Sequence, residues 1–281
     1  MAEIKKILIA NRGEIVQRAV RTIREMGKKS VAIYSAGDKN ASYLKHADEA
    51  VCIGGAKSSE SYLNIPAIIT AAEMTGCDAI FPGYGFLSEN QDFVEICRLH
   101  NIKFIGPSVE VMEKMADKSK AKEEMVKAGV PVVPGSKGAV HSVTEGKKVA
   151  LEIGYPIMAK AAAGGGGRGM RLIHDESEFD QLFMAASSEA LAAFGDGTMY
   201  LERFINNPRH IEVQVVGDSH GNAIHIGERD CSLQRRHQKV IEESPAILLN
   251  DETRAKLHDV AVKATKYLKY EGAGTFEFLA D

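Results

Sequence analysis

Hydrophobic and polar positions in the first hundred residues follow two alternating patterns, one typical of strands and one typical of helices. The strand-like runs are residues 7–10, 31–34, 79–81 and 104–105. Between the first two runs, Val16, Val20 and Ile23 recur at helical spacing and predict a helix over about 14–26 that ends at Gly27. Short buried strands that alternate with helices predict an open parallel sheet.

Polar segments follow two of these strands directly. Residues 11–14 come after the first strand and residues 82–90 come after the third. Ligands of open parallel sheets bind outside the carboxyl ends of the strands. The side chains of both segments are therefore candidates for a site.

The middle of the chain predicts a second, smaller unit after a helical connector that runs from Gly106 to Gly129. The segment from Ser142 to Glu145 has the pattern of a capping box for a helix that ends before Gly154. A second apolar stripe predicts a helix from about 175 to 195. We expect two helices and about four strands here.

Strand alternation returns in the last third, in residues 199–204, 210–216, 223–226 and 274–281, and predicts antiparallel pairing. Glu277 lies between Phe276 and Phe278, so alternation places its carboxylate on the opposite face of the strand from both rings. Such a carboxylate suits a Mg²⁺ ion that bridges phosphates. It equally suits an ordinary solvated glutamate, and the local pattern does not separate the two.

A glycine-rich loop at residues 164–169 carries the clearest chemical signal. It follows an apolar run that ends in Lys160 and precedes a second short run at 170–174, which predicts a hairpin-like flap. Glycine lets backbone N–H groups approach anionic oxygens closely, so the expected ligand is a polyphosphate. The alternative is an exposed linker, which seldom lies between two apolar strands with a lysine beside it.

Composition narrows the class of protein. The chain has 281 residues, 44% of them hydrophobic, and a net charge of −3. It therefore has no general positive field for nucleic acid or an anionic membrane, and the basic cluster at 235–239 is local. The four cysteines form no C-x-x-C pair, which indicates reduced thiols, three of them in the core. With no apolar run of about 18 residues and no signal sequence, we expect a cytoplasmic protein.

Seven segments together resemble the biotin carboxylase family of ATP-grasp enzymes. They are residues 9–15, 82–90, 164–170, 207–214, 228–232, 234–240 and 272–278. The resemblance implies an α/β fold of three parts: a Rossmann-like parallel-sheet domain at 1–114, a small α+β lid with its connector at 115–204, and the start of an antiparallel-sheet domain at 205–281.

The resemblance also implies a set of ATP-binding residues. They are Lys118, Lys160, Gly166, Gly167, Glu202, Arg203, Phe204, Ile205, His210, Gln234, His237, Glu277 and Leu279. The two lysines would hold phosphates, the flap amides would cap them, and the segment 202–205 would face the adenine. Without the resemblance, the lysines fit surface positions, the histidines fit structural roles, and Ile205 and Leu279 fit core packing.

Catalytic roles are implied for three residues, Lys239, Arg236 and Gln234, with Lys239 binding bicarbonate and Glu277 binding the metal. Arg235 and Arg236 could otherwise be solvated. The implied reaction transfers a phosphoryl group from ATP to bicarbonate. The resulting carboxyphosphate releases CO₂, which N1 of biotin takes up. ATP and Mg²⁺ or Mn²⁺ are the implied cofactors, and biotin is a carrier-bound substrate.

The implied partners are a biotin carboxyl carrier protein and carboxyltransferase subunits, with a homodimer as the complete assembly. In the family a second metal-binding glutamate, an asparagine, biotin-stabilising arginines and a bicarbonate base follow the counterpart of Asp281. We therefore expect these 281 residues alone not to carboxylate biotin.

The preferred reading is the biotin carboxylase of acetyl-CoA carboxylase. Pyruvate and other biotin-dependent carboxylases, other ATP-grasp ligases and an inactive nucleotide-binding module are the alternatives.

Overall fold

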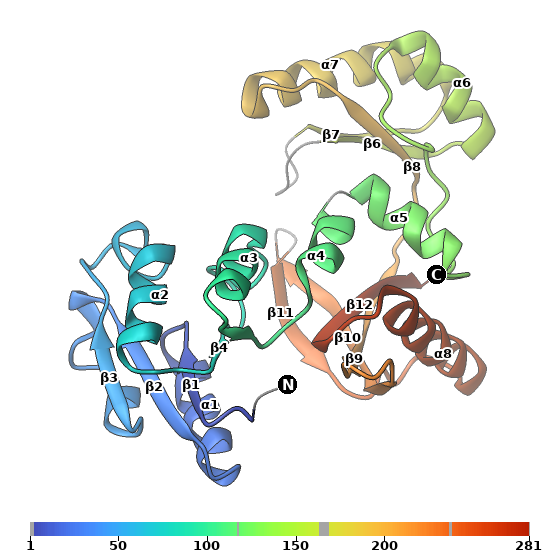
Figure 1. Cartoon of the computed structure of the whole chain (residues 1–281). Coiled ribbons are helices and arrows are strands. Elements are labelled where there is room, and N and C mark those ends of the chain that lie inside the picture. Colours follow the sequence, from blue (N-terminus) through green and yellow to red (C-terminus); the bar gives the residue numbers. More distant parts are fainter. Residues whose placement is uncertain (1–2, 117, 163–168, 236–237, 281) are drawn as a thin grey trace. The chain divides into compact units, whose positions relative to one another are not determined.

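The computed structural model describes residues 3–116, 118–162, 169–235 and 238–280, with backbone alone at 116 and 118–120. The chain forms two compact units, Met1–Glu113 and Lys114–Asp281. The three-part division expected from the sequence stays a prediction. Figure 1 labels most of the helices and strands of both units.

The first unit is built on the predicted parallel sheet, whose five strands have the order β3-β2-β1-β4-β5. The strands are β1 (Lys6–Ile9), β2 (Lys29–Tyr34), β3 (Glu49–Cys52), β4 (Ala79–Phe81) and β5 (Lys103–Phe104). Strand β3 was not predicted. It lies at the edge of the sheet and none of its side chains is buried, so it carries no alternating pattern.

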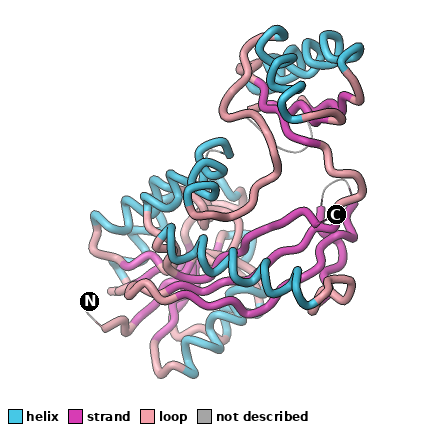
Figure 2. Tube along the Cα trace, turned by 90° about the vertical axis from the view of Figure 1, so that its right-hand side faces the viewer, coloured by secondary structure: helices cyan, strands magenta, loops and turns pink. Residues whose placement is uncertain are grey.

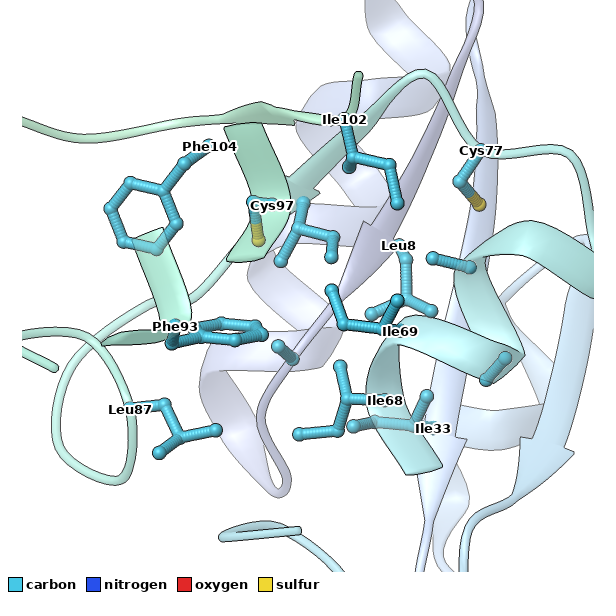
Figure 3. Packing of buried hydrophobic residues seen from close by; sticks show 14 of the residues in the cluster. Leu8, Ile33, Ile68, Ile69, Cys77, Leu87, Phe93, Cys97, Ile102 and Phe104 are labelled. Carbon is cyan, nitrogen blue, oxygen red and sulfur yellow. The ribbon is translucent and has the colours of Figure 1, made fainter. Parts of the chain in front are cut away.

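Helices cover both faces of this sheet. They are α1 (Glu14–Glu25), α2 (Ile65–Met74) and α3 (Gln91–Leu99). Helix α1 packs Val16, Val20 and Ile23 against one face, and it ends as predicted, with Gly27 in the left-handed region at φ 69°. On the other face α2 and α3 contribute Ile68, Ile69 and Phe93 to the core that Figure 3 shows.

The second unit begins with α4 (Val109–Ala116), which crosses the unit boundary, and α5 (Lys118–Lys127). A three-stranded sheet follows, in the order β7-β6-β8. Its strands are β6 (Ile157–Ala161), β7 (Met170–Ile173) and β8 (Met199–Arg203). The helices α6 (Val143–Ile153) and α7 (Glu176–Phe194) pack on it, as Figure 2 shows.

The prediction of about four strands in this small sheet was wrong, since the described part holds three. The segment before α6 contributes only single bridges, Gly135 to Glu202 and Val140 to Met199. The segment bends at residues 137–138, between the two bridges, so it does not form a continuous ladder with β8.

The structure confirms the predicted bounds of α6 and α7, the two helices that pack on this sheet. The Ser142 hydroxyl accepts the Glu145 N–H at 3.2 Å, while the Glu145 carboxylate accepts the His141 N–H at 3.0 Å. Helix α7 begins after Asp175 and ends at Gly195, whose φ of 76° suits glycine.

The last part of the second unit is a four-stranded antiparallel sheet with the order β11-β10-β9-β12. Its strands are β9 (Arg209–Gly217), β10 (Ala223–Arg235), β11 (Gln238–Glu243) and β12 (Gly272–Ala280). Helix α8 (Asp251–Leu268) packs on one face through Ala261. Figure 1 shows the helix beside the sheet.

Two elements here were not predicted. Helix α8 buries mainly small residues, Ala261, Ala264 and Thr265, which leave a weak hydrophobic pattern. Every side chain of β11 is exposed, so the strand shows no alternation.

Candidate active site

The face of the four-stranded sheet that α8 does not cover carries the polar side chains of the site. Along β9, Ile211, Val213 and Val215 are fully buried, and the latter two pack with Ala261 of α8. Successive side chains of a strand point to opposite faces. His210 and Glu212 therefore lie on the other, uncovered face.

Strand pairing brings two more polar residues to this face. Glu277 of β12 and Arg229 of β10 both pair directly with Glu212, one on each side of β9. Phe276 and Phe278 pack into the core on the α8 side. The predicted orientation of Glu277, opposite to both rings, is confirmed.

Glu212 is the centre of an ion-pair network. Its carboxylate, 7% exposed, accepts from Arg229 Nε at 2.7 Å and from the Lys239 ammonium group. Lys239 Nζ also lies 3.5 Å from Glu277 Oε1, and His210 Nδ1 lies 3.7 Å from that same oxygen. The structure thus brings together Lys239, His210 and Glu277, three residues singled out from the sequence.

The charges of this network support one another. Burial opposes ionisation of Glu212, but Lys239 and Arg229 outweigh it and keep the pKa of that carboxyl below its usual value. Burial also opposes the positive charge of Lys239, but Glu212 and Glu277 outweigh it and raise the pKa of that ammonium group. Lys239 is therefore a fixed positive charge at neutral pH, which suits an anion.

A second cluster lies where the glycine loop leaves the small sheet. Lys160, near the end of β6, is paired with Glu202 of β8. Lys122 of α5 reaches the other oxygen of that carboxylate, with Nζ 2.6 Å from Glu202 Oε1. Burial would raise the pKa of Glu202, but the two lysines outweigh burial and lower it.

The segment expected to face adenine is largely engaged within the fold. The N–H groups of Arg203 and Phe204 donate to Pro134 O at 2.8 Å and Pro156 O at 2.9 Å. The Arg203 guanidinium donates to Ile153 O. Ile205 follows β8 and is partly buried.

The remaining described candidates lie around the uncovered face. Gln234 of β10 donates to Cys231 O at 3.0 Å, and Arg235 ends the same strand. Leu279 of β12 pairs with His210 and is 38% exposed. Gly166, Gly167, Arg236 and His237 lie outside the described residues. Lys118 begins α5, and its side chain also lies outside the description.

Sequence reasoning did not assign roles to Glu212, Arg229 and Lys122. Glu212 alternates with apolar neighbours as any solvated strand glutamate does, and only the pairing of the strands brings Arg229 and Lys239 to it. Lys122 has no local pattern at all, because its partner Glu202 is 80 residues away.

Cys231, one of three buried cysteines among the described residues, lies beside this network. Burial raises the pKa of its thiol to about 11. Its sulfur lies within 4.8 Å of carboxylate oxygens of Glu212 and Glu242. Because Glu212 is already neutralised by two cations and the thiol stays protonated, this group is a poor metal site.

In the first unit, the two polar segments lie at the carboxyl ends of β1 and β4 and are joined by hydrogen bonds. The buried Asn11 side chain donates to Pro82 O at 2.7 Å and to Tyr84 O at 2.8 Å. Arg12 pairs with Asp38, whose carboxylate also accepts from the Tyr62 hydroxyl at 2.6 Å. Arg12 and Tyr62 lower the pKa of the Asp38 carboxyl to about 2 against the effect of burial.

Comparisons with known proteins agree with this arrangement. Residues 3–112 match the model of the biotin carboxylase N-terminal domain. Residues 117–281 match the model of the carbamoyl-phosphate synthase L chain ATP-binding domain. The chain belongs to the biotin carboxylase family. The family resemblance and the ATP-grasp fold expected from the sequence are confirmed.

Three relatives illustrate the similarity. Biotin carboxylase from Nostoc sp. is 57% identical, over 98% of this chain and 62% of its own. The structure of a biotin carboxylase–β,γ-ATP complex from Campylobacter jejuni is 68% identical, with a TM-score of 0.91 over 99% of this chain and 63% of its own.

The third is the biotin carboxylase domain of a Hydrogenobacter thermophilus 2-oxoglutarate carboxylase, in complex with MgADP, ADP and bicarbonate. It is 49% identical, with a TM-score of 0.88 over 100% of this chain and 62% of its own. The chain thus spans about three-fifths of the length of these relatives.

None of the helices in the described part of the chain combines the length and the hydrophobicity of a membrane span.

Proposed function

We propose that the protein containing these residues carboxylates biotin on a carrier protein, using ATP and bicarbonate. The observation that carries the proposal is the uncovered sheet face, where Lys239 is held as a cation beside Glu277 and His210. A positive charge fixed by a buried carboxylate suits bicarbonate, the anion named in one relative's structure. The family of the chain supports the same reaction.

ATP is proposed to bind through the Lys160 cluster, while Lys239 binds bicarbonate. Lys160 is at the point where β6 enters the glycine loop, so its ammonium group suits a phosphate. Lys118 would supply a second charge, Gly166 and Gly167 would supply amides, and the segment 202–205 with Leu279 would contact adenine. These assignments rest on the resemblance to the family.

Magnesium fits the same face. The Glu277 side chain is 51% exposed, so its carboxylate can accept a hydrated cation, and Mg²⁺ prefers such oxygen ligands. When bound, the ion would neutralise phosphate charge. The chain's own part is to hold Glu277 in place through the ladder between β12 and β9.

The proposed chemistry begins with attack of a bicarbonate oxygen on the γ-phosphorus of ATP, which breaks the bond to ADP. The carboxyphosphate formed divides into CO₂ and phosphate, and N1 of biotin bonds to the CO₂ carbon while its N–H proton passes to the released phosphate. Lys239 holds bicarbonate, and Arg236 and Gln234 are proposed to assist. Charge neutralisation and exclusion of water matter because carboxyphosphate is hydrolysed easily.

We further propose that the protein forms a homodimer and acts with a biotin carboxyl carrier protein and carboxyltransferase subunits. The preferred enzyme system is acetyl-CoA carboxylase, and the proposed location is the cytoplasm. The acceptor of the second half-reaction varies among relatives, since one of them belongs to a 2-oxoglutarate carboxylase. Acetyl-CoA therefore remains one acceptor among several.

The test is ADP release by the protein as it is encoded, with bicarbonate and free biotin omitted in turn. Biotin carboxylase activity requires bicarbonate and is stimulated by biotin. ADP release that needs bicarbonate and ammonia but ignores biotin would instead indicate carbamoyl phosphate synthesis. The model that matches residues 117–281 makes this the second candidate.

A further inference from the structure

Glu202 lies between two lysines that come from different elements. Lys160 of β6 contacts Oε2, and Lys122 of α5 contacts Oε1 at 2.6 Å. The Glu202 side chain is only 14% exposed, so its negative charge needs a cation beside it. The pair of lysines provides one more positive charge than the carboxylate requires.

The two lysines are held very differently. Lys122 Nζ donates to Glu202 Oε1, to the Tyr200 hydroxyl at 3.0 Å and to Val133 O at 3.1 Å. An ammonium group has three N–H donors, so all three are used. Lys122 Nζ also lies 4.9 Å from the centre of the Tyr200 ring. By contrast, Lys160 Nζ has Glu202 as its one hydrogen-bond acceptor among the described residues.

We propose that Lys122 is a positioning residue for nucleotide binding: it keeps Glu202 neutralised when Lys160 turns to the phosphates. This inference rests on the proposed function, because it takes Lys160 as a phosphate ligand. Lys122 itself touches no substrate. It lets Lys160 leave Glu202 without stranding a buried charge.

The ligand concerned is a nucleoside polyphosphate, since only a strongly anionic group can compete with Glu202 for Lys160. Without Lys122, the same step would leave Glu202 alone in a mostly buried position. The carboxylate would then either retain Lys160 or take up a proton. Both outcomes weaken nucleotide binding, and the second also couples binding to proton uptake.

The experiment is isothermal titration calorimetry of MgADP binding to the protein as it is encoded, at pH 7, in two buffers of different ionisation enthalpy. The variants are Lys122→Met, Glu202→Gln and the double variant. The control is Lys127→Met, which removes a lysine from the same helix, where its side chain is 58% exposed and pairs with Glu124 at 2.7 Å.

We expect Lys122→Met to weaken MgADP binding about tenfold, the effect of losing one charged contact of about 1.4 kcal/mol. Proton uptake on binding should rise above the native value in this variant. A glutamine at position 202 needs no cation, so the double variant should bind within about threefold of Glu202→Gln. Lys127→Met should match the native protein.

Native-like affinity and unchanged proton uptake in Lys122→Met would overturn the inference. So would a double variant that binds as poorly as Lys122→Met, which would indicate a purely structural defect. Absence of MgADP binding by the native protein would instead contradict the proposed function itself.

Discussion

Replacing Glu212 by glutamine should destabilise the protein strongly, although the side chains are nearly identical in shape. Glu212 is 7% exposed and is the shared acceptor of Arg229 and Lys239. Glutamine has one acceptor oxygen, so it can keep Arg229 but must turn an NH₂ group toward Lys239. The substitution leaves a partly buried ammonium group without its main counter-charge.

The magnitude follows from these contacts. A hydrogen bond to a charged group contributes about 1.5–3 kcal/mol, and breaking a fully buried pair costs about 3–5 kcal/mol. Lys239 is 33% exposed, and in the variant it still has Glu277 at 3.5 Å. The expected cost therefore lies in the lower part of the combined range of about 1.5–5 kcal/mol. We expect a loss of about 2–3 kcal/mol in the free energy of unfolding.

The assay is urea unfolding followed by circular dichroism, with Glu242→Gln as the matched control. Glu242 lies 3.7 Å from the same Arg229 but is 43% exposed, so its loss should cost at most about 1 kcal/mol. Because the folded state lowers the pKa of Glu212, its stabilisation is present above the usual carboxyl pKa. It disappears as the pH falls through the lowered value. Equal losses for the two variants at pH 7 would refute the reasoning.

Three further predictions concern other sites. Gly83→Ala should lower the melting temperature more than Gly85→Ala. Both glycines have φ near +67°, so the backbone strain of an alanine is similar at the two positions. A Cβ at Gly83 would come within 3.0 Å of a buried amide nitrogen, whereas a Cβ at Gly85 would meet nothing within 4 Å. The Asp38 carboxylate should stabilise the fold fully above pH 4, so Asp38→Asn should lower the melting temperature there. This difference between the variant and the native protein should shrink as the pH falls toward the Asp38 pKa of about 2, which measurements of melting temperature against pH would show. Glu277→Gln should raise the Mg²⁺ concentration that gives half-maximal ADP release about tenfold, and an unchanged requirement would remove Glu277 from the metal site.

Elements with regular periodicity were predictable from the sequence, and those without it were not. The helix at 14–25 has large apolar residues one turn apart, and the strand at 272–280 alternates throughout. Helix α8 buries alanines and β11 buries nothing, so neither leaves the signal on which such reasoning depends.

The residues of the candidate site were likewise predictable only in part. Lys239 lies within a segment that resembles the family, and Lys160 ends the apolar run just before another such segment, so both could be found without a structure. Glu212 and Lys122 act through partners that are distant in the sequence, and their roles depend on strand register and on the packing of α5.

We propose that the two clusters have separate functions: Lys160 binds the nucleotide and Lys239 binds bicarbonate. The most direct test compares steady-state kinetics of Lys160→Gln and Lys239→Gln in the protein as it is encoded, with biotin present. Lys160→Gln should raise the KM for ATP about tenfold or more, the effect of one lost charged contact. Lys239→Gln should lower bicarbonate-dependent turnover while ATP binding stays near native. Unchanged bicarbonate saturation and turnover in Lys239→Gln would contradict the assignment of Lys239 to bicarbonate.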